Sequence, residues 1–145
     1  MTDSRLGVTP RRSIDAACGR RGRRAVVDGC VALVHGERVD PDLLGALAGP
    51  AAAKFRDGRA RPDDSWLRVW GTRGLLWAWE PSAAPAIDVA LTDEAWRVRE
   101  MALRVVRRHL LGDTLPVVVR LRDDPVARVR AAASRAVATL TAAGA

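Results

Sequence analysis

The feature that most constrains the fold is an internal repeat. Residues 93–110, DEAWRVREMALRVVRRHL, are echoed 31 residues later by DPVARVRAAASRAVATLT at residues 124–141. With the alignment extended to residues 82–110 and 113–141, eight of 29 positions are identical. The identical pairs are Pro85/Pro116, Asp93/Asp124, Arg97/Arg128, Val98/Val129, Arg99/Arg130, Ala102/Ala133, Arg104/Arg135 and Val106/Val137. A repeat of this length indicates stacked helical units that share one core.

Residues 96–109 are amphipathic when they are placed on a helix. The charged side chains share about a third of the circumference, and apolar side chains fill most of the rest. Arg99 is the exception because it projects into the apolar arc, and Arg130 does the same in the echo. A buried guanidinium needs an anionic or carbonyl partner. Asp93, six residues before Arg99, and the matching Asp124 in the next unit are the two candidate partners.

The composition favours a single helical domain. Ala, Val, Leu and Arg dominate, strand patterns are scarce, and a chain of 145 residues is long enough for one real core. No uncharged run approaches the length of a membrane span, so we expect no membrane partner. The chain has 24 Lys and Arg side chains together and lacks Tyr. Part of this arginine richness is typical of the codon bias of a high-GC genome.

The pattern D-x-x-x-R-V-R-x-x-A, after a shorter helix with an early Pro, resembles the HEAT repeat of short bacterial HEAT-repeat proteins. The resemblance implies an all-α fold, a short α-solenoid of about three repeats within residues 24–145. Residues 82–112 and 113–141 are the clear repeats, and residues 50–80 are a divergent one. In this family the Asp and the inward Arg form a ladder between repeats. The matching ladder residues are Asp93, Arg99, Asp124 and Arg130.

The divergent repeat departs from the family pattern. When Asp64 and Val69 are aligned with Asp93 and Val98, Trp70 stands where the ladder Arg would be, so two rungs are expected. The family is defined by packing, so the resemblance implies a fold and no particular activity.

Residues 1–23 are predicted to form a loosely ordered basic arm. Gly and Pro interrupt the segment, and residues 1–24 carry seven Arg and two Asp, which accounts for most of the net charge of +7. One interpretation is a disordered leader, or residues ahead of the true start. The other is an arm that binds nucleic acid or an acidic partner. The lack of aromatic side chains for base stacking favours the leader.

Residues 66–79 are predicted to form the central, mostly buried helix. Gly71 and Gly74 form a smooth strip with Ala78 that allows another helix to approach closely. Trp66, Trp70 and Trp77 form an aromatic stripe along this helix. Trp79 lies on the opposite side of the helix from this stripe and is the candidate for an exposed anchor. The stripe either fills the core or lines a groove, and the core is favoured because Trp is large and apolar.

The sequence offers no catalytic constellation. A phosphate loop, a zinc-protease helix and a nucleophile elbow are all missing. His35 and His109 are isolated, and a packed or capping role suits His109 better than catalysis. Cys18 and Cys30 fit neither a redox nor a zinc spacing, so reduced thiols in a cytoplasmic protein are expected. We therefore predict no catalytic residues, no metal and no cofactor.

Rows of arginine mark the candidate binding surface. In a HEAT stack the second helices line the concave face, and arginines of the three second helices align there. The candidate binding residues are Arg68, Arg97, Arg104, Arg108, Arg128 and Arg135, together with Trp79. A solvated face, with Glu100 pairing with Arg104 one helical turn on, explains the same rows equally well.

The function predicted from these features is a non-catalytic interaction module. An Arg-rich concave face would hold a protein partner with an acidic surface, because solenoids mostly offer extended surfaces. The alternative is nucleic-acid binding, with phosphates gripped by the same arginines and by the basic arm. A third hypothesis is a HEAT-like DNA glycosylase, but the sequence has no convincing equivalent of the catalytic Asp that those enzymes carry between aromatic side chains.

Overall fold

Every regular element in the part of the chain that the structure describes is a helix. The computed structural model describes residues 9–53 and 65–144. The α-helices are α2 (Pro10–Arg21), α3 (Arg23–Val34), α4 (Pro41–Ala48), α6 (Ser65–Gly74), α7 (Ala84–Ala90), α8 (Trp96–His109), α9 (Leu115–Arg120) and α10 (Ala127–Gly144). The short 3-10 helices are η1 (Gly49–Ala52), η2 (Pro81–Ala83), η3 (Gly112–Thr114) and η4 (Leu121–Asp123). The predicted all-α class is confirmed, and none of these helices is long and apolar enough to cross a membrane.

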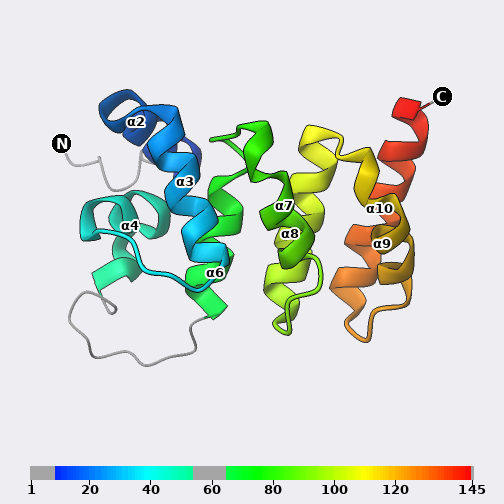
Figure 1. Ribbon diagram of the computed structural model, residues 1–145. Helices are drawn as coiled ribbons and strands as arrows, with labels where there is room; N and C mark the ends of the chain where they lie inside the picture. The colour runs from blue at the N-terminus through cyan, green and yellow to red at the C-terminus, as the bar shows by residue number, and fades with distance from the viewer. Residues whose placement is uncertain (1–8, 54–64, 145) are drawn as a thin grey trace.

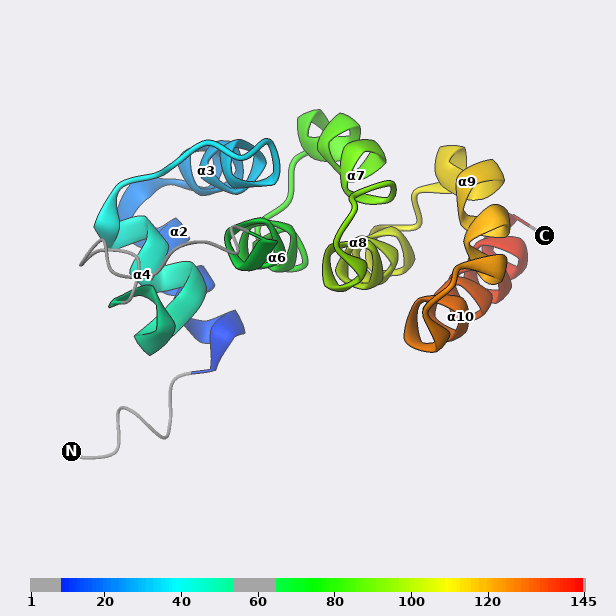
Figure 2. The ribbon, with the colours of Figure 1, turned by 90° about the horizontal axis from the view of Figure 1, so that it is seen from below.

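The helices are arranged in pairs that follow one another along the molecule (Figure 1). Helix α3 packs on α6, α7 on α8, and α9 on α10. Neighbouring pairs meet mainly through their second helices, α6 on α8 and α8 on α10. Seen end-on, α6, α8 and α10 form one row, and α3, α7 and α9 form the other (Figure 2). Helices α2 and α4 pack beside α3 and α6 at the N-terminal end.

Helix α8 has the bounds that its amphipathic pattern predicts. Its apolar arc is buried, with Val98, Val105 and Val106 inaccessible to solvent. Its last turn is basic, which favours the helix because cations stabilise the negative C-terminal end of the helix dipole. The helix ends at Leu110, a non-glycine residue with left-handed backbone angles, φ 54° and ψ 53°. The chain then turns into the last pair.

The prediction that residues 1–23 form a loose arm is wrong for residues 10–21. These residues form α2, where the Thr9 hydroxyl caps the helix by accepting from the Arg12 N–H at 3.2 Å. Ile14 and Ala17 are fully buried. Arg21, one of the arginines of the predicted arm, pairs with Asp40, which caps α4, and with Asp42 in the first turn of α4. Residues 1–8 of the predicted arm lie outside the described residues.

The first helix pair also differs from the prediction. The divergent repeat was placed at residues 50–80, but α6 pairs with α3 instead. The glycine strip makes this contact: a Cβ added to Gly71 would lie 2.6 Å from the Leu33 Cβ, and one added to Gly74 would lie 2.5 Å from the Cys30 Sγ. The strip therefore admits a neighbouring helix, as the sequence predicted. Helix α6 ends at Gly74, five residues before the predicted end.

Candidate functional site

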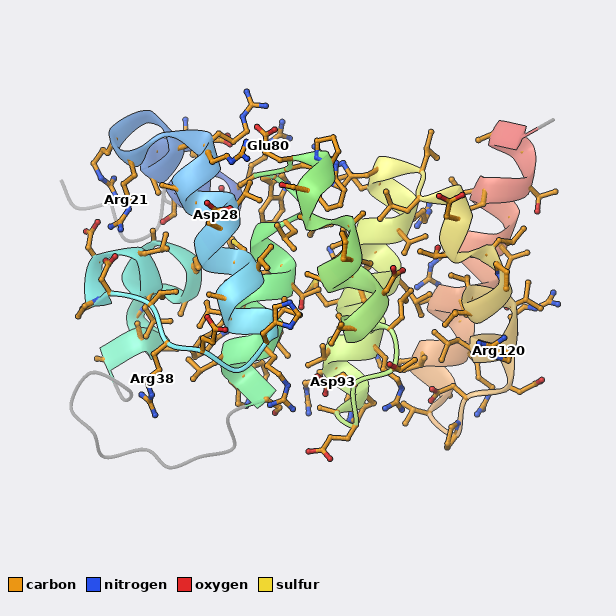
Figure 3. All side chains as sticks on the ribbon, viewed as in Figure 1. Arg21, Asp28, Arg38, Glu80, Asp93 and Arg120 are labelled. Atoms are coloured by element: carbon orange, nitrogen blue, oxygen red, sulfur yellow. The ribbon has the colours of Figure 1, made fainter. Side chains whose placement is uncertain are left out.

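Two arginine–aspartate pairs connect successive second helices to the next turn. Arg99 donates from Nε to Asp124 Oδ2 at 2.8 Å and from Nη2 to Oδ1 at 3.0 Å. Arg68 makes the same two bonds to Asp93, at 2.7 and 3.2 Å. All four side chains are largely buried, with exposed fractions of 18% or less. Asp93 lies in the turn between α7 and α8 (Figure 3). We call these two pairs the ladder.

The ladder carboxylates also start the helices that follow them. Asp93 Oδ1 accepts from the Ala95 N–H at 2.8 Å, and Asp124 Oδ1 accepts from the Val126 N–H at 2.9 Å. Burial alone would raise the pKa of Asp124. The hydrogen bonds from Arg99 and Val126, with the charges of Arg99 and Arg130, outweigh burial and hold that pKa below its ordinary value. The ladder is therefore a structural feature, because its four side chains are engaged with one another and with backbone N–H groups.

Arg68 is misplaced in the sequence prediction. It was assigned to the binding surface, with Trp70 in the ladder position, because the divergent helix was aligned two residues out of step. The structure places Arg68 31 residues before Arg99 with the same bonding, so Arg68 is a ladder residue. Trp70 is instead buried, with 7% of its surface exposed. Arg68 is accordingly removed from the candidate binding surface.

Arg130 repeats only half of the Arg99 arrangement. Its Nη1 donates to the backbone oxygens of Asp124 and Pro125, at 2.8 and 3.1 Å. Arg99 binds the oxygens of Asp93 and Glu94 at the same distances. Arg130 is exposed, and no carboxylate within residues 9–53 and 65–144 pairs with it. Arg130 therefore resembles Arg99 in its backbone bonds but has no ion pair with a carboxylate of the described residues.

Arg97 and Arg128 lie against tryptophan rings. The Arg97 guanidinium carbon is 5.3 Å from the centroid of Trp66 and 4.5 Å from that of Trp96. The Arg128 carbon is 5.7 Å from the Trp96 centroid, and its Nε lies 3.1 Å from Glu100 Oε2. Cation–π contacts thus engage both predicted binding arginines, and an ion pair also engages Arg128. Glu100 pairs with Arg128 of the next helix rather than with Arg104 along α8, whereas Arg97, Arg104 and Arg128 are exposed, as the solvated-face interpretation also expects.

Three arginines of α8 surround a pocket of about 400 Å³. Their positions are i, i+3 and i+4, so they share one helix face. The pocket lies where α8 meets the turn after α6 and the C-terminal part of α10. It is lined by Arg104, Arg107, Arg108, Leu76, Trp77 and Thr139. We call it the arginine pocket.

Only some of the N–H donors of the pocket arginines bond to the protein. Arg107 Nε donates to Thr139 Oγ1 at 3.2 Å, and Arg108 Nε donates to the Leu76 carbonyl at 2.7 Å. Arg104 contacts only a thioether, Met101 Sδ, at 3.8 Å. None of the three pairs with a carboxylate of the described residues. The Nη groups of Arg107 and Arg108 therefore make no bond to the described chain.

A fourth arginine carries positive charge close enough to interact with Arg104. Arg73 lies on α6, 31 residues before Arg104, and donates from Nη2 to the Leu47 carbonyl at 2.7 Å. Its buried Nε has no partner among the described residues. Burial lowers the pKa of Arg73, and the charge of Arg104 lowers it further. Arg135, the next residue of this row, is exposed on α10 and does not line the pocket.

Trp79 is not the exposed anchor that the sequence predicted. It is half-buried and stacks on His109, with ring centroids 4.3 Å apart and planes 14° apart. The reason is that α6 stops at Gly74, so the helical wheel that placed Trp79 outward does not apply. His109 Nε2 also lies 2.8 Å from the Leu75 carbonyl. His109 is a packed residue, as expected.

The predicted tryptophan stripe divides between core and surface. Trp70 is buried, whereas Trp66 has 40% of its surface exposed and stacks on Trp70 at 6.2 Å. Trp77 lies past the end of α6 and lines the arginine pocket. Sequence analysis missed both Trp77 and Arg107 as members of one site. The available signal was the i, i+3, i+4 spacing of the three arginines.

The described residues hold no group of three or more His, Cys, Asp or Glu suited to a metal ion. Both cysteines are free, and burial raises the pKa of Cys30 to about 12, with Cys18 adding to the shift. Cys30 is therefore a core thiol with little thiolate.

The chemistry that the arginine pocket offers is anion binding. Comparisons with protein-family models, with curated proteins and with solved structures found no significant match.

Proposed function

We propose that this protein is a short HEAT-like α-solenoid that acts as a non-catalytic interaction module in the cytoplasm. Three observations support the architecture: the 31-residue repeat, the two rows of helices and the ladder. In such a stack the row of α6, α8 and α10 is the concave face. The arginine pocket opens on this row, and it is where we place the contact with an acidic protein partner.

The arginine pocket is the single observation that carries this proposal. Arg104, Arg107 and Arg108 line one pocket without a carboxylate partner in the described residues, and the charge of Arg104 also acts on Arg73. Like charges held close together repel, and a bound anion relieves that repulsion while gaining charge-assisted hydrogen bonds. Such a patch also steers an acidic partner toward the surface. Binding thus supplies the countercharge that the described fold leaves out.

Nucleic-acid binding is the second candidate, and one observation favours it. Trp77 lines the arginine pocket and Trp66 is exposed on the same row, so aromatic faces accompany the guanidiniums. Stacking platforms beside a basic groove are typical of single-strand binding. The glycosylase hypothesis gains less support. Glu100 pairs with Arg128, the arginine that lies over Trp96, so this carboxylate is engaged in an ion pair.

A charge-reversal experiment tests the proposal. The pocket variant Arg104→Glu/Arg108→Glu is compared with Arg120→Glu/Arg122→Glu, which changes net charge equally. Arg120 and Arg122 are exposed on α9 and η4 and do not line the pocket. Figure 3 shows Arg120 on α9. Binding of a labelled acidic peptide is measured at physiological salt. We expect the pocket variant to weaken binding at least tenfold and the control to bind nearly as the wild type does.

Two results would count against this function. Equal weakening by both variants would mean that the peptide senses only net charge. Preference for a single-stranded oligonucleotide over the acidic peptide, with affinity falling steeply as salt rises, would favour the nucleic-acid alternative.

A further inference from the structure

We infer that the anion recognised by the arginine pocket is a phosphoryl group on the protein partner, as in a phosphoserine or phosphothreonine side chain. The inference rests on the proposed function, because it names the chemistry of the group bound at the same site. It arises from the number of guanidiniums, from the donors that they leave unused and from the walls of the pocket.

The ladder shows how this protein binds a carboxylate. One guanidinium meets one carboxylate through two parallel bonds, Arg99 to Asp124 and Arg68 to Asp93. The remaining contacts to these carboxylates come from backbone N–H groups. A singly charged group with two oxygens is thus satisfied by one arginine and a main-chain donor.

The arginine pocket offers more charge than one carboxylate can use. Arg104, Arg107 and Arg108 bring three positive charges to one cavity. A phosphate monoester carries about 1.5 to 2 negative charges near pH 7 and has three strong acceptor oxygens. A phosphodiester of nucleic acid carries only one charge per phosphate. The charge and the acceptor geometry of a monoester therefore match the pocket best.

The donors are positioned before a ligand arrives. Arg107 and Arg108 are each held through Nε, by the Thr139 hydroxyl and by the Leu76 carbonyl. A guanidinium anchored through Nε keeps its two Nη groups for a ligand. Fixing these long side chains in advance reduces the entropy lost on binding. The Thr139 hydroxyl, which accepts from Arg107, can donate its own proton to a phosphoryl oxygen.

The pocket also has an apolar wall. Leu76 and Trp77 form it, beside the arginines. The methylene of phosphoserine, or the methyl of phosphothreonine, would lie against this wall while the phosphoryl group faces the guanidiniums. A volume of about 400 Å³ is large enough for one modified side chain.

The test uses the full chain and three ligands at equal ionic strength. The first is a short glycine peptide with one central phosphoserine, the second has Glu in its place, and the third is single-stranded oligothymidine. Calorimetry gives the affinities, and the ³¹P resonance of the phosphopeptide reports binding directly. We expect the phosphopeptide to bind at least tenfold more tightly than either of the other two.

Variants connect that preference to the pocket. Arg107→Gln removes a positioned donor and should weaken phosphopeptide binding at least tenfold. Arg104→Gln changes a side chain that makes no bond to the backbone, so it keeps the fold intact and should weaken binding several-fold. Arg120→Gln, on α9, is the matched control and should bind as the wild type does.

Each result bears on the inference. Equal affinity for the phosphoserine and Glu peptides, or no effect of either pocket variant, would overturn it. Preference for oligothymidine would overturn it in favour of nucleic acid. If the Glu peptide binds as tightly as the phosphopeptide and both pocket variants release it, the inference fails while the proposed acidic-partner function stands.

Discussion

Arg99 of α8 binds Asp124 through two parallel hydrogen bonds, across the junction between two consecutive helix pairs. The same guanidinium donates from Nη1 to the Asp93 carbonyl at 2.8 Å. One side chain therefore joins the turn before its own helix to the turn before the next one. Arg68 and Asp93 repeat the carboxylate contact one unit earlier. The contact fixes the spacing between neighbouring pairs.

The ladder makes the first prediction. Arg99→Gln leaves Asp124 buried without its cation, so we expect it to lower the free energy of unfolding by roughly 3–5 kcal/mol. Arg130→Gln is the matched control, because Arg130 makes the same two backbone bonds as Arg99 but is exposed and acts on the Asp124 carboxylate only through its charge, without an ion pair. Its effect should stay below about 1 kcal/mol. Urea unfolding measures both, and similar losses would mean that the carboxylate contact contributes little.

The second prediction concerns the close approach of α3 and α6. In Gly71→Ala the new methyl would lie 2.8 Å from the Cys30 carbonyl oxygen, and backbone cannot move aside cheaply. We expect a loss of about 1–3 kcal/mol in unfolding free energy. Gly19→Ala is the control, since Gly19 lies in α2 with nothing within 4 Å of the added Cβ. It should gain roughly 0.5–1 kcal/mol from higher helix propensity. A stable Gly71→Ala variant would contradict this packing.

The third prediction concerns the C-terminal end of α8. Leu110 has a positive φ of 54° and is 51% exposed, so its side chain contributes little while its backbone is strained. Leu110→Gly should raise the unfolding free energy by up to about 1 kcal/mol, because glycine adopts left-handed angles without steric cost. Val89→Gly removes another exposed apolar side chain, but from inside α7. It should destabilise by roughly 0.5–1 kcal/mol, and thermal denaturation should separate the two variants in opposite directions.

The pH dependence of stability makes the fourth. Burial lowers the pKa of His109, the charge of Arg108 lowers it further, and the hydrogen bond to the Leu75 carbonyl opposes both. The folded state then binds a proton less readily than the unfolded state, whose histidine has a pKa of about 6.5. Stability is therefore fully present above about pH 6.5 and is lost as the pH falls through the lower folded pKa. Melting temperatures from pH 8 to 5 should show this decline.

A variant identifies the group responsible for that decline. His109→Gln keeps a polar side chain and removes the titration, so its melting temperature should fall less over the same pH range. His35→Gln is the control, because His35 is exposed in the turn after α3 and is not a partner in the Trp79–His109 stack. If the two variants have the same pH profile, His109 is not the group that titrates.

Much of the helical structure was predictable because it depends on neighbours in sequence. The bounds of α8 follow from the amphipathic spacing of residues 96–109. Asp40 before Pro41 marks the start of α4, and the Asp40 carboxylate accepts from the Leu43 N–H at 2.9 Å. The glycine strip predicted a close helix contact without naming the partner helix. Signals of this kind act within one or two helical turns, so the sequence states them directly.

The members of the candidate site were harder to predict. Arg68 was assigned to the surface and Trp70 to the position of the ladder arginine, although in the structure Arg68 is the ladder residue and Trp70 is buried in the core. An alignment error of two residues rotates a helical position by about 200°, which exchanges the two faces. Trp79 was predicted to be exposed because the predicted helix continued to residue 79, whereas α6 ends at Gly74.

By itself, the sequence determined that the chain is helical, that a 31-residue unit recurs and that out-of-place arginines need partners. Only the tertiary structure decided which arginines found them. Arg68 and Arg99 met buried carboxylates, whereas Arg104, Arg107 and Arg108 met none in the described chain. The physical reason is distance along the chain. An ion pair joins side chains 25 residues apart, and the packing of one helix pair on the next sets their separation.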